Sequence, residues 1–446
     1  MSAVPSLIDP QKVARDAVAL GLRLGADEVR ASVGRADDVQ LQRRGGRLER
    51  AQEARTFGLS VSLFVDGRYS SHSSSDMRPE AIAALMERGV ESTRLLEPDP
   101  DRALPDRALM GGLDEASLDL DDPAARQRDP ARRREELEAL EARAIAAAPA
   151  DLISTTAHLW EGRSESWMCL SNGFEAQSAR TTFGWGVEAT LKEAETGKLP
   201  EGYAFEQAVH LSDRPSADAL MAELDEALSL TRRTSACASG RYLMVLDARV
   251  VGRLLGALLG PMSGGALHER RSVFLGKLGE QVASPRFSLF DDPTIPRGLG
   301  SRSTDGDGLL PVRRALIDEG VLKTPLLDVY YARKLGMAPT TGGVSNLVVP
   351  VGDRSWRAAT AALPEAIRVT SFLGGNTNPA SGDFSFGIRG QLLRHGEAVQ
   401  NLSEMNITGN ILDLYANFVE AADDVRLNSS TRSPSLLFDG VSFSGA

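Results

Sequence analysis

Hydrophobic residues recur at helical spacing near the start of the chain and then alternate with polar residues. Residues 10–25 (PQKVARDAVALGLRLG) place their apolar side chains on one face of a helix, and the pattern ends at a glycine. Between residues 27 and 75 the period changes to two, which indicates strands, and the Asp66-Gly67 pair predicts a tight hairpin turn there. A second helical pattern over 78–96 completes a predicted N-terminal domain, residues 1–96.

The pattern then changes twice before residue 236. Residues 97–150 are rich in Asp, Pro, Arg and Ala up to about residue 130, which predicts a linker, and then form a strongly charged helical pattern over 131–148. Residues 151–235 return to strand-like alternation, with a turn predicted at Asn172-Gly173 and a helix over 215–231. We expect this third segment to join the N-terminal domain.

Residues 236–446 are predicted to form a C-terminal domain rich in glycine and short strands. It begins with a buried strand over 241–247, followed by an apolar helical pattern over 248–263. Helices and strands do not alternate regularly along the whole chain, so the predicted fold class is α+β. We expect an N-terminal α/β domain with hairpins and helices, and a C-terminal, mostly β domain with a few helices.

Length and charge narrow the classes of function. The chain has 446 residues, more than one ordinary core accommodates, and its 50 basic and 61 acidic residues give a net charge of −11. That sign argues against nucleic acid or an anionic membrane as the main partner. The two cysteines, Cys169 and Cys237, exclude a disulfide framework but leave a single bridge between them open.

No segment of the sequence has the pattern of a membrane span or a signal peptide. The most apolar stretch, residues 241–267, is interrupted by Asp247, Arg249 and Arg253. The first residues carry no apolar run of signal-peptide length. We therefore expect a cytoplasmic protein.

His268-Glu269 is the dipeptide with which a zinc-peptidase motif begins. Such a motif needs a second histidine four or five residues after the first, so that both imidazoles face one metal ion. Here Ser272 and Val273 occupy those two positions. The pair offers two ligands at most, and a metal site there would require a third from a distant part of the chain.

Several ordered segments resemble the TldD/PmbA (TldD/TldE) family of metallopeptidases. The likeness runs from about residue 13 to the C-terminus, and its N-terminal part lies within residues 25–76. The C-terminal segments that carry it are SVFLGKLGEQVASP (272–285), GLGSRSTDGDG (298–308), RRALIDEGVLKTPLLDVYYARKLGM (313–337), GGVSNLVV (342–349), NPASGDFSFGIRGQLLRHGEAV (378–399) and ITGNILDLYANFVEAADDV (407–425).

The resemblance implies a heterodimeric zinc peptidase of which this chain is the TldE (PmbA)-like, non-catalytic subunit. In the family's catalytic subunit an HExxxH motif lies on a helix before the SVF segment, and the corresponding residues here, 255–260 (LGALLG), hold no ligand. The catalytic subunit also uses a cysteine ligand before its last strands, and residues 424–440 contain no cysteine. The resemblance thus implies no catalytic residue, metal ligand or cofactor on this chain, and zinc on a TldD-like partner that carries HExxxH.

Under this reading the chain shapes a chamber and a dimer interface of an enzyme that proteolyses small or unfolded peptides. Two alternatives remain open: a non-catalytic homodimeric peptide-binding or scaffold protein, and a divergent peptidase active on its own through His268 and Glu269. Two glycine-rich loops are the candidates for lining the substrate, although ordinary turn chemistry explains their composition equally well. Their candidate residues are Gly374, Gly375, Asn376, Gly382, Asp383 and Phe384.

Overall fold

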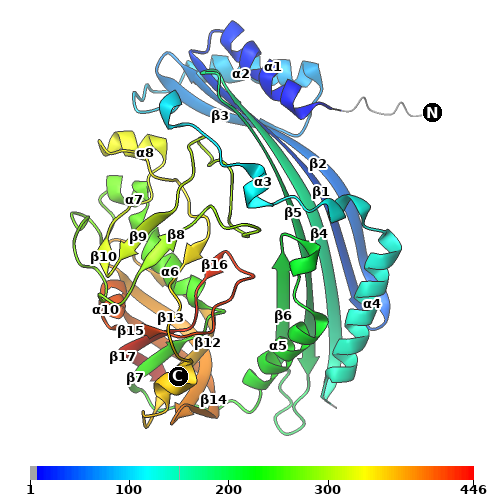
Figure 1. Cartoon of the computed structure of the whole chain (residues 1–446), viewed down its shortest axis with the longest axis vertical. Coiled ribbons are helices and arrows are strands. Elements are labelled where there is room, and N and C mark those ends of the chain that lie inside the picture. The colour runs from blue at the N-terminus through cyan, green and yellow to red at the C-terminus, as the bar shows by residue number, and fades with distance from the viewer. Residues whose placement is uncertain (1–7, 150, 446) are drawn as a thin grey trace.

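The computed structural model describes residues 8–149 and 151–445, and its N-terminal half is built on one long, curved antiparallel sheet (Figure 1). The strand order is β3-β2-β1-β4-β5-β6, so strands from before and after the linker share one sheet. Four of the strands have 17 to 19 residues, far more than is usual. The bounds are β1 (Glu28–Arg44), β2 (Arg47–Val65), β3 (Arg68–Ser74), β4 (Leu152–Leu170), β5 (Glu175–Leu191) and β6 (Glu201–Ala208).

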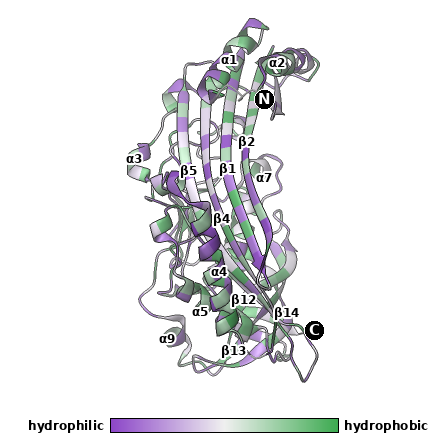
Figure 2. Ribbon diagram, turned by 90° about the vertical axis from the view of Figure 1, so that its right-hand side faces the viewer, coloured by the Kyte–Doolittle hydropathy of each residue, from purple (hydrophilic) through white to green (hydrophobic). Residues whose placement is uncertain are grey.

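Helices cover this sheet at both of its ends. At one end α1 (Pro10–Arg23) and α2 (Pro79–Thr93) bury their apolar faces against β1 and β2. At the other end α4 (Pro130–Ala147) and α5 (Ala217–Leu230) form a second core with β4, β5 and β6. In each core, the apolar face of a helix packs against the face of the sheet to which every second strand residue points. The colouring along the strands shows this alternation of hydrophobic and hydrophilic residues (Figure 2).

The linker between α2 and α4 is mostly irregular and contains three short helical turns. These are Arg107–Leu109, α3 (Glu115–Leu118) and Pro123–Gln127, and an aspartate side chain caps the start of each. The linker also holds the two halves together, because the Lys334 ammonium of the C-terminal half contacts Asp99 at 2.9 Å and Asp101 at 3.1 Å.

In the C-terminal half, five strands form a ring. The order is β14-β13-β12-β7-β17, and β14 pairs back to β17, so the sheet closes on itself, while β15 extends it beside β17. The bounds are β7 (Gly240–Leu246), β12 (Ala366–Thr377), β13 (Asp383–Arg394), β14 (Glu397–Asn410), β15 (Phe418–Ala421) and β17 (Leu436–Gly445).

A second, smaller sheet and several short helices pack beside this ring. The sheet has the order β10-β9-β8-β11-β16, with β8 (Leu289–Asp291), β9 (Arg314–Asp318), β10 (Val321–Leu322), β11 (Leu347–Val348) and β16 (Thr431–Arg432). The helices are α6 (Val251–Leu259), α7 (Gly264–His268), α8 (Val329–Lys334), α9 (Trp356–Thr360) and α10 (Ile411–Ala416).

The structure confirms the predicted α+β class and most of the local predictions. Asp66 and Gly67 have φ angles of 49° and 70° and connect β2 to β3, and Gly173 has a φ of 84° in the turn between β4 and β5. The apolar helix predicted over 248–263 is shorter, because the chain turns into a 3-10 helix at Gly260–Met262, where Pro261 has no N–H to continue the α-helical ladder.

Both cysteines are free thiols, which resolves the open question of a bridge. Cys169 is buried, and burial raises the pKa of its thiol to about 11. Within residues 8–149 and 151–445, no helix has both the length and the apolar character needed to cross a membrane.

Candidate functional site

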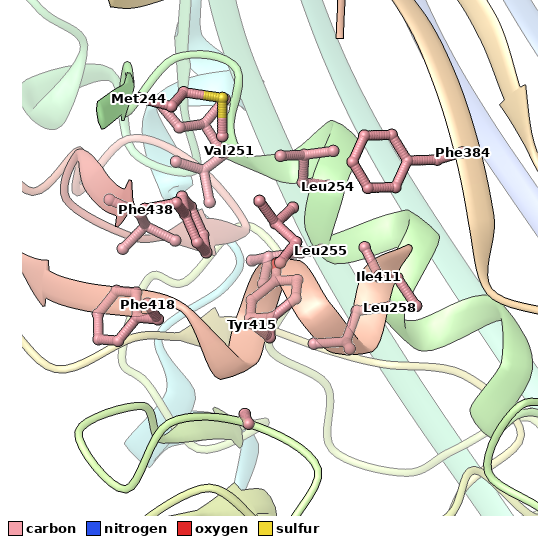
Figure 3. Close-up of a cluster of buried hydrophobic side chains, with 14 of the residues drawn as sticks. Met244, Val251, Leu254, Leu255, Leu258, Phe384, Ile411, Tyr415, Phe418 and Phe438 are labelled. Carbon is pink, nitrogen blue, oxygen red and sulfur yellow. The ribbon is translucent and has the colours of Figure 1, made fainter. Parts of the chain in front are cut away.

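Helix α6 occupies the place where the resemblance puts the metal-binding helix of a catalytic subunit. Leu255 and Leu258 on this helix are 0% exposed and pack with Ile411 and Tyr415 of α10, as Figure 3 shows. This helix therefore belongs to the core of the C-terminal half. On the opposite face a Cβ added at Gly256 would meet no atom within 4 Å, so that face is open. These side chains do not fit a metal ion, because none of them offers a donor atom.

His268 and Glu269 lie at the end of α7 and are not joined by further ligands. The His268 ring lies 6.1 Å from the ring of Tyr331, and the Glu269 carboxylate forms an ion pair with Arg271. Across the part of the chain that the structure describes, no group of three or more His, Cys, Asp or Glu side chains is placed to hold a metal ion.

The six candidate substrate-lining residues lie on one β-hairpin formed by β12 and β13. Gly374 and Gly375 are exposed, with φ angles of 150° and 107°, and Gly375 pairs with Phe386 across the hairpin. Asn376 pairs with Ser385, and the guanidinium of Arg253 on α6 donates to the Gly375 carbonyl at 2.8 Å.

The remaining three candidates lie in and just after the turn of this hairpin, next to Asn376. Gly382 has a φ of 83°, and Asp383 accepts hydrogen bonds from Ser381 and Asn410, which lower the pKa of its carboxyl. Phe384 is 5% exposed and belongs to the hydrophobic core beside Phe386, at 5.6 Å between ring centroids. Its side chain therefore packs inward, and the role of this hairpin in lining a substrate stays a prediction.

A cleft of about 700 Å³ lies between the two halves of the molecule, and none of the six candidates lines it. One wall is formed by β6, which is an edge strand of its sheet, together with α5. The other wall is formed by the segment leading into α6, by Thr370 and Ser371 of β12, and by residues 426–431. The segment leading into α6 and residues 426–431 approach each other here, since a Cβ at Gly252 would lie 3.5 Å from Thr431 Oγ1.

Aromatic side chains form a platform on the β6 wall of the cleft. Phe205 lies 6.1 Å from Trp160 and 6.0 Å from Tyr203 between ring centroids. The rings lean over two glycines of β5: a Cβ at Gly184 would come within 2.1 Å of the Trp160 ring, and one at Gly186 within 2.0 Å of the Phe205 ring. The two glycines therefore leave the space that the Trp160 and Phe205 rings occupy against the sheet.

The charged groups of the cleft are paired in part. Arg426 donates to Glu206, and to Glu223 at 2.9 Å, and so ties β6 and α5 to the C-terminal half. Burial raises the pKa of Glu206 to about 7, with Arg426 opposing this rise and Glu223 adding to it.

Two further arginines line the cleft and differ in their environment. Arg249 donates to Asp247 at 2.8 Å and to Glu226 at 3.0 Å. Arg389 on β13 is exposed, and its guanidinium has no ion-pair partner among the residues described.

The sequence reasoning missed this cleft because its residues lie far apart in the chain. They come from positions between 160 and 431. One local signal was present: the FGWGV sequence (183–187) places glycines at alternate positions inside a strand, a pattern that indicates the close approach of another group.

Comparisons with known proteins cover nearly the whole chain. Three family models match it: the PmbA/TldA metallopeptidase domain 1 over residues 28–93, the central domain over 123–236 and the C-terminal domain over 239–445. The metalloprotease PmbA of Escherichia coli O157:H7 is 25% identical over 100% of this chain and 99% of its own length. A PmbA homologue of Haemophilus influenzae is 26% identical over 96% of this chain and 94% of its own length.

Solved structures agree with this likeness. A Bacteroides thetaiotaomicron protein, described as a candidate modulator of DNA gyrase, is 33% identical, with a TM-score of 0.93 and 98% of each chain covered. TldE from Thermococcus kodakarensis shares the fold at 18% identity, with a TM-score of 0.85 over 97% of this chain and 100% of its own. Since the family models together match most of the chain, including the long sheet and the closed ring of strands, this chain belongs to the PmbA/TldD metallopeptidase family.

Proposed function

We propose that this chain is the TldE-like, non-catalytic subunit of a heterodimeric zinc metallopeptidase that acts on small or unfolded peptides in the cytoplasm. The observation that carries the proposal is the pair Leu255 and Leu258, which are fully buried in the core where a catalytic subunit has its metal-binding helix. Asn428, Ser429 and Thr431 line the cleft in the segment where such a subunit has its cysteine ligand.

In this proposal the zinc, the general base and the activated water belong to a TldD-like partner that carries HExxxH. Peptide hydrolysis requires a polarised carbonyl and a nucleophilic water, and a zinc site supplies both. This chain contributes a chamber wall and an interface. The parallel pairing of β12 with β7 ends at Val369, so the β7-facing edge of the strand beyond that residue is not covered by β7. An extended peptide can add to such an edge whatever its side chains are.

The test compares peptide hydrolysis by this chain alone, by a TldD-like homologue alone and by an equimolar mixture. We expect cleavage only in the mixture, which should also elute as a hetero-oligomer. Metal analysis after purification without chelator should find zinc in the partner and less than stoichiometric zinc in this chain.

Two results would contradict the proposal and identify which alternative holds. Cleavage by the isolated chain, abolished by Glu269→Ala and accompanied by zinc that His268→Ala removes, would indicate a peptidase active on its own. A stable homodimer that neither binds the homologue nor promotes cleavage would indicate a scaffold or peptide-binding protein.

A further inference from the structure

The balance of charge across the cleft leaves one cation available to a ligand. Of the three arginines that line it, Arg249 and Arg426 are neutralised by acidic neighbours. Arg389, by contrast, has no acidic partner among the described residues, and it pairs across the hairpin with Ser371, which also lines the cleft. A planar guanidinium beside a hydroxyl group suits the bidentate recognition of a carboxylate.

The opposite wall offers an apolar surface next to this cation. Tyr203 and Phe205 are 64% and 39% exposed, although aromatic rings of this size are normally covered in a folded protein. Gly186 leaves room for the Phe205 ring against the sheet, as Gly184 does for the Trp160 ring, so these two rings are positioned by packing within the chain. Glu201, at the start of the same strand, is exposed and has no ion-pair partner among the residues described. The unpaired carboxylate of the cleft therefore lies on the β6 wall, and the unpaired guanidinium of Arg389 lies on the β13 wall.

We propose that this cleft binds the C-terminal end of a short peptide, with the carboxylate on Arg389 and an apolar side chain on the platform of Trp160, Tyr203 and Phe205. The volume of about 700 Å³ lies within the range of sites that enclose small ligands. The inference rests on the proposed function only for the choice of a peptide as the ligand class. It adds a second peptide site, on the subunit that lacks the metal.

The test measures binding to the full-length chain by calorimetry, with no partner subunit and no metal present. The probes are acetyl-Ala-Ala-Phe with a free carboxylate, the C-terminal amide of the same peptide, and acetyl-Ala-Ala-Ala with a free carboxylate. We expect the amide to bind about tenfold more weakly than the free acid, because one charge-assisted, bidentate contact is lost. The alanine peptide should also bind more weakly than the phenylalanine peptide.

Variants separate the two contacts. Arg389→Gln should weaken binding of the free acid about tenfold and leave the amide unchanged, whereas Tyr203→Ala should weaken both phenylalanine peptides. Arg47→Gln is the matched control, because Arg47 is an exposed arginine at the start of β2, outside the cleft. All three side chains are exposed, so the variants should fold, and circular dichroism would verify this.

Three results would overturn the inference. The first is equal affinity of the chain for the acid and the amide, and the second is an Arg389→Gln variant that prefers the acid over the amide as strongly as the unaltered chain does. The third is the absence of binding by any probe at millimolar concentration. Each is independent of the proposed function, because the binding assay needs neither a partner nor zinc. Conversely, a mixture that fails to cleave peptides would contradict the proposed function and leave the binding result standing.

Discussion

Glu206 shows at the scale of a single residue how the cleft changes the chemistry of a side chain. Its side chain is 11% exposed and lies between Arg426 and a second acid, Glu223. Burial penalises the ionised form, and the neighbouring carboxylate adds to that penalty, so the pKa rises to about 7 although Arg426 opposes the rise. Glu206 therefore holds a proton in the folded state over a pH range in which the unfolded chain has lost it.

The sign of the pH dependence follows from this difference. The folded state binds more protons than the unfolded state between about pH 4.5 and 7, so the contribution of Glu206 to stability is full below that window and is lost as the pH rises through it. Glu206→Gln should therefore stabilise the protein more at pH 8 than at pH 4.5. The change that it causes in the free energy of unfolding should differ between the two pH values by roughly 1–3 kcal/mol. Urea denaturation at a series of pH values measures this.

Glu201→Gln is the matched control for this prediction, since Glu201 is an exposed acid on the same strand. Its effect on stability should be small and should not change across the window. A stabilisation by Glu206→Gln that is equal at pH 4.5 and pH 8 would contradict the raised pKa.

At the scale of an element, α6 combines a buried face and an open face within nine residues. Val251, Leu254, Leu255 and Leu258 are each 0% exposed, whereas Gly252 and Gly256 lie on the open side. The buried face of α6 packs in the core of the C-terminal half, and the open face of the helix carries no metal-binding side chain.

The packing of α6 predicts a large effect of truncation. Leu258→Ala should lower the free energy of unfolding by roughly 2–5 kcal/mol, because the surrounding core cannot collapse fully onto the lost volume. Leu95→Ala is the control: this leucine is 87% exposed, and its replacement should change stability by about 0.5 kcal/mol or less. Thermal and urea denaturation of the two variants would test the difference, and an equal loss in both would show that α6 is not part of the core.

At the scale of the whole molecule, buried charges join the two halves behind the cleft. Asp247, at the end of β7, is 3% exposed and accepts from Arg249 at 2.8 Å and from Arg368. Both arginines also contact Glu226 on α5, each at 3.0 Å. The arginines, chiefly Arg249, lower the pKa of Asp247 despite its burial, so this carboxylate stays ionised in the folded protein.

Removing the central acid of this network should destabilise the protein more than removing an ion pair on the surface. Asp247→Ala leaves the buried Arg368 and the half-buried Arg249 short of an anion, and we expect a loss of roughly 3–5 kcal/mol. Asp16→Asn is the control, because the Lys12–Asp16 pair has side chains 69% and 64% exposed and should contribute about 1 kcal/mol or less. Equal midpoints of denaturation for the two variants would show that the network does not hold the halves together.

The sequence by itself determined the features that depend on neighbouring residues. The helix near residue 10, the Asp66-Gly67 turn and the apolar character of 255–260 are all local, because backbone geometry fixes the period of an element within a few residues. The α+β class followed from the order of such elements.

Only the tertiary structure decided which distant positions meet. The pairing of β1 with β4 across the linker, the closure of the ring by β14 and β17, and the cleft between β6 and β13 all join segments far apart in the chain. The sequence makes Phe384 a substrate-lining candidate in a glycine-rich loop, yet on β13 it alternates with exposed residues and packs inward. Burial, free charge and shifted pKa values arise from such contacts, and no local pattern specifies the partner that a strand edge or a charged side chain will find.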